Sequence, residues 1–267
     1  MNKWLKILLW CALFSGVTAV LIWERDKEAN AKLSMPVIDI SVQGKDTFLT
    51  KKEIINRLQT QQIFNPQGLV SGLDISKVES ILDTMQEIKH ADVYKQLNGS
   101  WNIDLELVKP IARVFPEGHA SFYLDADGNK MRRSSIHTAR SLIFSGNIPD
   151  RIQTENVNSI INNDSLKSIR LLDDIYRISN YVCKDPLLQS LIGQVYLNEN
   201  NDFIMIPVLG DQKIVFGTAH SEKEVREKFQ RLKIFYKEAI PYEGWNKYSE
   251  ISLKYEGQIV CKKVSSK

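Results

Sequence analysis

The chain has 267 residues and a mass of 30.6 kDa, a length that suits one or two domains at about 150 residues per domain. Hydrophobic residues make up 43% and charged residues 25%, which is ordinary globular composition and excludes a wholly disordered chain, a collagen and a polytopic membrane protein. The net charge of +3 is too small to predict nucleic-acid binding, and three cysteines are too few for a disulfide scaffold.

The N-terminal segment predicts a single membrane-spanning helix. Residues 7–23 contain no charged side chain, and a bilayer core of about 30 Å needs roughly 17–25 apolar residues. Lys3 and Lys6 precede this run, so the positive-inside rule places residues 1–6 in the cytoplasm and everything after the helix outside. We therefore expect a single-pass protein of the cell inner (plasma) membrane with a periplasmic C-terminal region.

The alternative for this segment is a cleaved signal peptide. The small residues up to Ala19 form a passable cleavage site, but the apolar run continues to Trp23 and favours an uncleaved anchor. The charged, Ala- and Asn-containing residues 24–35 are typical of a solvated linker.

Residues 36–109 predict a small α+β unit. Alternating apolar residues indicate strands, and two capping boxes indicate helix starts, in the order strand, helix, helix, strand, strand. The expected elements are strand 37–42, helices that begin at the capping boxes Thr50–Glu53 and Ser76–Glu79, and strands 91–93 and 101–107, with a tight turn at Asn98-Gly99.

Residues 110–267 predict a larger, sheet-rich unit with flanking helices. Short apolar runs between turn residues indicate strands, and apolar stripes at helical spacing indicate helices. The expected elements are a hairpin over 122–131, a helix from Asp164 through Val182, strands 194–197, 203–206 and 213–216, a helix from Ser221 that stops at Pro241, and a final hairpin of 251–255 and 258–263 around Glu256-Gly257.

No pattern of residues predicts catalysis, a cofactor or a metal. The histidines lie in separate elements without metal-ligand spacing; they are His90, His119, His137 and His220. The segment that starts at Asp125 lacks the glycine and glutamate of a calcium loop, and there is no nucleophile or phosphate-binding motif. The adjacent Asp173 and Asp174 point in different directions on a helix and are expected to be solvated.

The cysteines leave two possibilities open. Cys11 lies in the predicted membrane run, whereas Cys183 and Cys261 share an oxidising compartment in which a disulfide is chemically possible. Because nothing in the sequence brings these two residues within bonding distance, two free thiols are the favoured alternative.

A series of short motifs runs through the outer region. They are Ile40–Gly44 with Leu49–Ile54, Ile88–Val93, Glu106–Ala112, Tyr123–Gly128, Ser145–Pro149 and Gly244–Cys261. In this order they resemble the FtsQ/DivIB family of bacterial cell-division proteins, and the last two resemble its Bacteroidetes members. Lys45 stands where the family usually has Asn, and residues 151–191 match only in their helical character.

This resemblance implies a non-enzymatic scaffold of the division machinery, enriched at the division septum, with a POTRA domain and a β domain. It implies that the β domain binds an FtsB/FtsL-like pair of bitopic proteins, that the POTRA domain contacts other division proteins, and that no small-molecule substrate or nucleic acid is bound.

Two other classes of protein compete with this interpretation, a membrane-anchored periplasmic hydrolase and an outer-membrane assembly factor. The chain lacks the many strands of about ten residues that a membrane barrel requires.

The final hairpin is the expected partner site. A sequence-final strand often lies at a sheet edge, where free backbone groups can accept a partner strand, although its own fold can also cover it. Together with the aromatic residues that resemble partner contacts of the family, the expected partner-binding residues are Tyr248, Tyr255, Gln258, Ile259, Val260, Cys261, Lys262 and Lys263.

Overall fold

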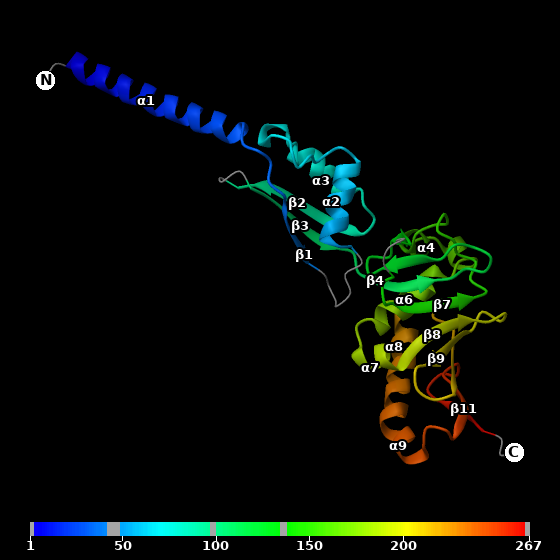
Figure 1. Cartoon of the computed structure of the whole chain (residues 1–267). Coiled ribbons are helices and arrows are strands. Elements are labelled where there is room, and N and C mark those ends of the chain that lie inside the picture. Colours follow the sequence, from blue (N-terminus) through cyan, green and yellow to red (C-terminus); the bar gives the residue numbers. More distant parts are fainter. Residues whose placement is uncertain (1–2, 42–48, 97–99, 134–137, 265–267) are drawn as a thin grey trace. The chain divides into compact units, whose positions relative to one another are not determined.

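The computed structural model describes residues 3–41, 49–96, 100–133 and 138–264. The chain divides into two units, Met1–Val108 and Lys109–Lys267 (Figure 1). The predicted Asn98-Gly99 turn, the motif residues Gly44 and Lys45, and His137 lie outside the described residues.

The first unit contains the predicted order strand, helix, helix, strand, strand, preceded by a long helix. Its elements are α1 (Lys3–Ala29), β1 (Val37–Ser41), α2 (Lys51–Thr60), the 3₁₀ turn η1 (Val70–Gly72), α3 (Ile75–Asp83), β2 (Ile88–Lys95) and β3 (Trp101–Leu107).

Side-chain caps start both short helices of this unit. The Thr50 hydroxyl accepts a hydrogen bond from the Glu53 amide at 3.3 Å, as the capping pattern predicts. The next helix, α3, begins earlier than expected, because Asp74 and not Ser76 caps it, accepting from the Lys77 amide at 3.1 Å.

The sheet of the first unit has the strand order β1-β3-β2. Strand β1 pairs parallel with β3, and β2 pairs antiparallel with it. Helices α2 and α3 cover one face of this sheet (Figure 1) and share one core with it. Its fully buried residues include Ile54, Leu58, Val78 and Leu82 from the helices and Ala91, Ile103 and Trp101 from the strands.

The predicted membrane-spanning helix over 7–23 is wrong. The chain forms helix α1 there, but among the described residues no helix is both long enough and apolar enough to cross a membrane. The apolar run has only the minimum length that spanning requires. The expected single-pass anchoring in the inner membrane, with its inside and outside ends, depended on this helix, and the described residues do not support it.

The second unit is built on a nine-stranded sheet. Its strands are β4 (Pro110–Val114), β5 (Phe122–Asp125), β6 (Lys130–Arg132), β7 (Leu142–Gly146), β8 (Ile192–Leu197), β9 (Phe203–Pro207), β10 (Lys213–Gly217), β11 (Tyr248–Ser252) and β12 (Val260–Lys263). They are arranged in the order β12-β11-β10-β9-β8-β7-β4-β5-β6.

Helices of the second unit pack against this sheet and enclose one hydrophobic core. They are α4 (Val157–Ile161), α5 (Asp164–Lys167), α6 (Leu172–Val182), α7 (Pro186–Leu191), α8 (Glu222–Ile234), the π-helical turn η2 (Phe235–Ala239) and α9 (Ile240–Glu243). Core residues such as Phe144, Val195 and Met205 of the strands meet Ile175 and Phe229 of the helices. Together with the first unit, this architecture is α+β.

Two predicted helices differ from the observed ones. The helix expected from Asp164 is divided into α5 and α6, with Asn163 as the cap of α5. The helix from Ser221 does not stop at Pro241, because the π-helical turn η2 shifts the hydrogen bonding. Pro241 then lies in the first turn of α9, where its missing N–H needs no partner.

The pair Asp173 and Asp174 is buried, not solvated as expected. The Arg177 guanidinium lies one turn further along α6 and reaches both carboxylates, at 2.7 Å from Asp173 and 2.6 Å from Asp174. It also donates to the Ala219 carbonyl at 3.0 Å, and His220 Nδ1 lies 3.2 Å from Asp174. This network joins α6 to the segment before α8. It also pairs the two buried carboxylates, and a buried charge is stable only when it is paired.

We expect Asp174 to give the unfolding free energy a distinct pH dependence. Burial, and after it the charge of the neighbouring Asp173, raises the pKa of Asp174 to about 6, while His220 and Arg177 oppose the rise. The folded state therefore binds this proton more tightly than the unfolded state, and the stabilising contribution of Asp174 decreases as the pH rises from about 4 to about 6. Asp174→Asn should lack that decrease in urea unfolding at pH 4, 5, 6 and 7.

The control is Glu199→Gln, which changes an exposed carboxylate in the turn between β8 and β9. Its stability should follow the pH curve of the unmodified protein. Parallel curves for Asp174→Asn and the unmodified protein would show that Asp174 titrates in the same way in the folded and unfolded states.

Candidate functional site

Strand β12 lies at one end of the nine-stranded sheet and pairs antiparallel with β11. Opposite residues in this pair include Ile251 with Cys261 and Ser252 with Val260, and the register shifts between Tyr248 and Glu250. No further strand pairs with the outer side of β12 among the residues that the structure describes. The outer backbone groups of β12 are therefore available to another chain.

The backbone of Cys261 points toward this outer side. The Leu253 amide donates to the Val215 carbonyl of β10 at 2.8 Å, so Ile251, two residues earlier, also directs its backbone groups toward β10. Cys261 lies opposite Ile251, and its N–H and C=O therefore point away from β11. Cys261 supplies a donor and an acceptor at the centre of the edge.

The connection between β11 and β12 is longer than predicted. Instead of a two-residue turn at Glu256-Gly257, residues 253–259 form a loop. Leu253 is fully buried and its amide donates to the Val215 carbonyl of β10, while β12 begins only at Val260, opposite Ser252.

Arg231 of α8 holds this loop. Its Nη1 donates to the carbonyl oxygens of Tyr255 at 2.6 Å and Gln258 at 3.2 Å, and its Nη2 donates to that of Leu253 at 3.3 Å. A guanidinium presents its donors in a fixed fork, so three bonds from one side chain define the path of the loop. Nothing in the sequence pattern of α8 identifies Arg231 as part of the site, because Arg231 is one of several charged residues on that helix.

The predicted partner residues lie in three places. Val260–Lys263 form β12 itself, and Gln258 and Ile259 lead into it. Tyr255 lies in the loop and is 53% exposed, whereas Tyr248 begins β11 and is half-buried. The two tyrosines therefore lie at opposite ends of β11.

The side chains of β12 alternate between two surroundings. Ile259 and Cys261 pack against the core on the helix side, whereas Val260 and Lys262 are exposed. Burial raises the pKa of the Cys261 thiol, so it stays protonated at neutral pH. The three cysteines Cys11, Cys183 and Cys261 are free thiols.

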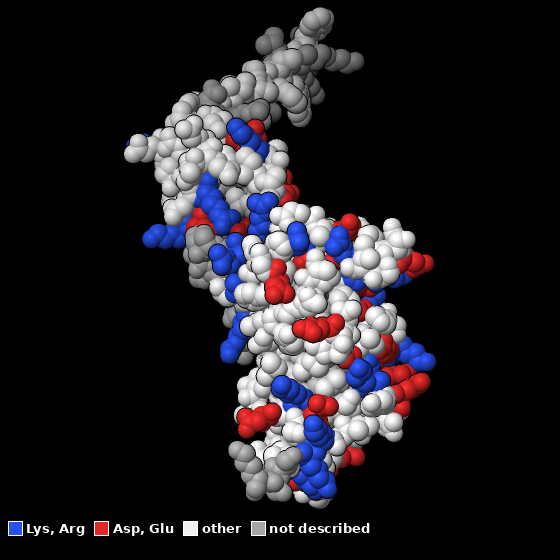
Figure 2. Space-filling model, turned by 90° about the vertical axis from the view of Figure 1, so that its right-hand side faces the viewer, with Lys and Arg blue, Asp and Glu red and all other residues white. Residues whose placement is uncertain are grey.

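Basic side chains gather at the end of the second unit where α9 and β11 lie, toward the bottom of Figure 2, while both signs of charge are mixed elsewhere on that face. Lys262 and Lys263 are both exposed on the edge strand, and Glu250 lies opposite Lys262 in the register. The edge strand therefore exposes two positive charges, and the negative charge of Glu250 lies beside one of them.

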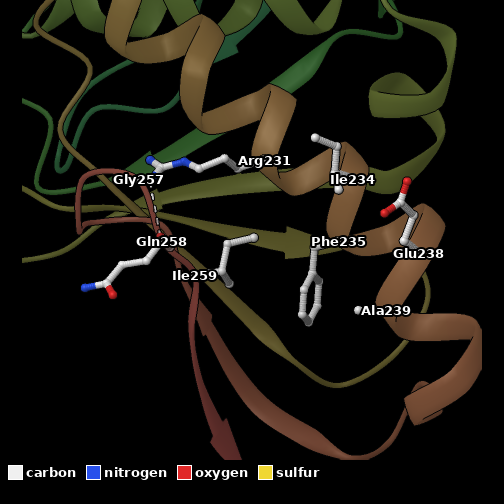
Figure 3. A pocket seen from close by; sticks show the side chains of 8 residues that line it. All are labelled: Arg231, Ile234, Phe235, Glu238, Ala239, Gly257, Gln258 and Ile259. Atoms are coloured by element: carbon white, nitrogen blue, oxygen red, sulfur yellow. Dashed lines mark hydrogen bonds between the residues drawn. The ribbon is translucent and has the colours of Figure 1, made fainter.

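A groove of about 360 Å³ opens beside the start of β12 (Figure 3). One wall is formed by Arg231, Ile234, Phe235, Glu238 and Ala239 of α8 and η2, and the other by residues 257–259. The Phe235 ring lies 6.0 Å from the Tyr248 ring, which ties the groove to β11. Sequence periodicity does not reveal this groove, because it depends on where a helix and a loop meet.

The three histidines that the structure describes do not come together in a site. His90 lies 3.3 Å from Asp92, His220 lies against Asp174, and His119 is exposed. In the described part of the chain no three His, Cys, Asp or Glu side chains are arranged to hold a metal.

Each of the two units matches a protein-family model. Residues 36–106 match the model of a POTRA-like domain, and residues 109–262 match the model described as FtsQ/DivIB, C-terminal related. No curated protein gives a significant match to the chain.

FtsQ/DivIB proteins are non-enzymatic proteins of cell division that act at the division site, so these matches support a role as a cell-division scaffold. The second match covers more than half of the sequence and extends from the start of the sheet into β12, the candidate edge. The chain is therefore a member of the FtsQ/DivIB C-terminal-related family, with a POTRA-like domain ahead of the family region.

Proposed function

We propose that this scaffold binds an FtsB/FtsL-like pair of division proteins by accepting a partner strand at β12. The proposed domains are a POTRA domain over 36–109, which contacts other division proteins, and a β domain over 110–267. The proteins so linked are held together at the division septum.

The observation that supports strand addition is the outward-facing backbone of Cys261 on an edge strand. Main-chain hydrogen bonds provide much of the affinity in such pairing, and side chains at alternate positions provide selectivity. The residues that we assign to the interface are Tyr248, Tyr255, Gln258, Ile259, Val260, Cys261, Lys262 and Lys263.

Proline at Cys261 should weaken partner binding by about tenfold or more. Proline has no N–H to donate to an added strand, and its ring clashes with extended pairing on that side. A net hydrogen bond is worth about 0.5–1.5 kcal/mol, and the clash adds to this loss. The measurement is titration of the purified chain with the purified FtsB/FtsL-like pair.

The matched control is Cys261→Val, which keeps the N–H and an apolar side chain and should bind nearly normally. Circular dichroism and the thermal midpoint establish that both variants are folded. Normal binding by folded Cys261→Pro would place the partner away from this edge.

Neutralising the two edge lysines should slow association in a salt-dependent way. Lys262→Ala combined with Lys263→Ala removes exposed positive charge, so the association rate should fall by about threefold or more at low salt. At 1 M salt the Debye length is about 3 Å, and the difference should disappear. Lys184→Ala, an exposed residue after α6, is the control. An equal reduction at both salt concentrations would contradict an electrostatic role.

Removing the Arg231 side chain should loosen the edge without unfolding the unit. Arg231→Met keeps much of the aliphatic stem but loses three hydrogen bonds to the loop, so amides 253–263 should exchange with solvent at least about tenfold faster. Partner affinity should fall with it. Arg226→Met, an exposed position on the same helix, should change neither quantity. Unchanged exchange in Arg231→Met would show that the loop is held by other contacts.

A further inference from the structure

The open face of the three-stranded sheet in the first unit carries a row of aspartates. Helices α2 and α3 cover the other face (Figure 1), so the residues that alternate with the buried ones point away from them. In the register of the sheet, Asp39 of β1 lies opposite Asp104 of β3, which lies opposite Asp92 of β2. Opposite Cβ atoms in a sheet are about 4.5–5.5 Å apart, and like charges at this spacing destabilise the sheet. A cationic ligand over the row would remove that repulsion.

The central carboxylate of the row, that of Asp104, lacks a cationic partner. Lys51 Nζ lies 3.8 Å from Asp39, and His90 Nε2 lies 3.3 Å from Asp92. Among the residues that the structure describes, no Lys, Arg or His side chain forms an ion pair with Asp104. Its Oδ1 is buried and has no hydrogen-bond partner. Leaving a buried acceptor without a donor is unfavourable, so Asp104 is the position in the row where a ligand would contribute most.

A second buried oxygen without a donor lies on the same face. Asn102 precedes Asp104 by two residues, so both side chains project from the same side of β3. Asn102 is only 8% exposed, and its Oδ1 has no hydrogen-bond partner. The Tyr94 hydroxyl accepts from Asn102 Nδ2 at 3.4 Å and donates to Asp104 Oδ2 at 3.2 Å, so the two side chains converge on one point. An amide oxygen and a carboxylate oxygen that both lack a donor call for a ligand with at least two N–H groups.

A guanidinium group fits this site better than a metal ion or an ammonium group. In the described part of the chain no three carboxylates or histidines gather closely enough to hold a metal. A guanidinium is planar and presents its N–H donors in a fixed fork, so it can donate to two neighbouring acceptors at once. The Tyr94 ring is 43% exposed and offers an aromatic face on which a guanidinium stacks. Because Tyr94 is exposed, its side chain can turn and admit the guanidinium to the two buried oxygens.

We propose that the open face of the sheet in the first unit binds an arginine side chain from a basic, extended segment of a partner protein. The guanidinium donates to Asp104 and Asn102 and stacks on Tyr94. Asp39 and Asp92, one strand away on either side, attract further basic residues of the same segment. This site lies in the first unit, so the proposal does not rest on strand addition at β12.

The probe for the test is the synthetic peptide Gly-Arg-Gly-Arg-Gly-Arg-Gly, blocked at both ends. It is titrated into the purified full chain while the amide NMR signals are followed, and the signals of β2 and β3 should shift. Asp104→Asn should raise the dissociation constant by about fivefold or more, because it removes the charge that strengthens the hydrogen bond. Asp211→Asn removes the same charge from an exposed position of the second unit and should bind the peptide as the unmodified chain does.

Two further comparisons test the assignment of a guanidinium. The same peptide with lysine in place of arginine has equal charge but no fork of donors, so it should bind at least about threefold more weakly. Tyr94→Leu loses the aromatic face and should weaken binding of the arginine peptide, whereas Tyr94→Phe keeps the ring, frees Asp104 Oδ2 and should bind at least as well as the unmodified chain. The Tyr94 variants leave every carboxylate in place, so they keep the test valid if circular dichroism shows Asp104→Asn to be misfolded.

Several outcomes would overturn the proposal. One is the absence of binding, and another is normal binding by folded Asp104→Asn or by Tyr94→Leu. Equal affinity for the arginine and lysine peptides would show attraction by charge alone. If calcium chloride alone shifts the same signals and displaces the peptide, the face is a metal site and not an arginine site. None of these results bears on β12, because the test contains no FtsB/FtsL-like pair.

Discussion

The parallel pairing of β10 with β11 determines the end of the molecule on which the candidate site lies. Parallel neighbours need a long crossover, and α8, η2 and α9 supply it. This crossover carries the chain past its own sheet and returns it at the outside, so that β11 and then β12 become the last strands. The unpaired outer side of β12 is therefore a consequence of topology.

The same crossover helix also shapes the surroundings of that edge. Arg231 of α8 binds the carbonyl groups of the loop before β12, and Phe235 of η2 forms part of one wall of the neighbouring groove. The π-helical turn shifts the hydrogen bonding of the helix where it passes β11. One helix thus positions both the backbone that would pair with a partner and the pocket beside it.

Sequence patterns predicted the local elements well where the cause is local. The Thr50 and Ser221 caps, the apolar stripes of α3 and α8, and the alternating strands of both units are properties of a few neighbouring residues. They failed where a distant residue decides. Asp174 lies against His220 and Arg177 bonds the Ala219 carbonyl, both from the segment before α8, and the loop after β11 is held by Arg231 of α8.

For this protein the sequence alone determined the α+β class, the order of elements in the first unit and the likeness to the FtsQ/DivIB family, because these depend on periodicity, capping and motif order. Length and absence of charge predicted a membrane-spanning helix at 7–23, whereas no helix among the described residues is long and apolar enough to cross a membrane. The tertiary structure alone decided that β12 is an edge, that Arg231 binds its loop and that a groove lies beside it. These features join residues that are distant in sequence, and no local pattern encodes such contacts.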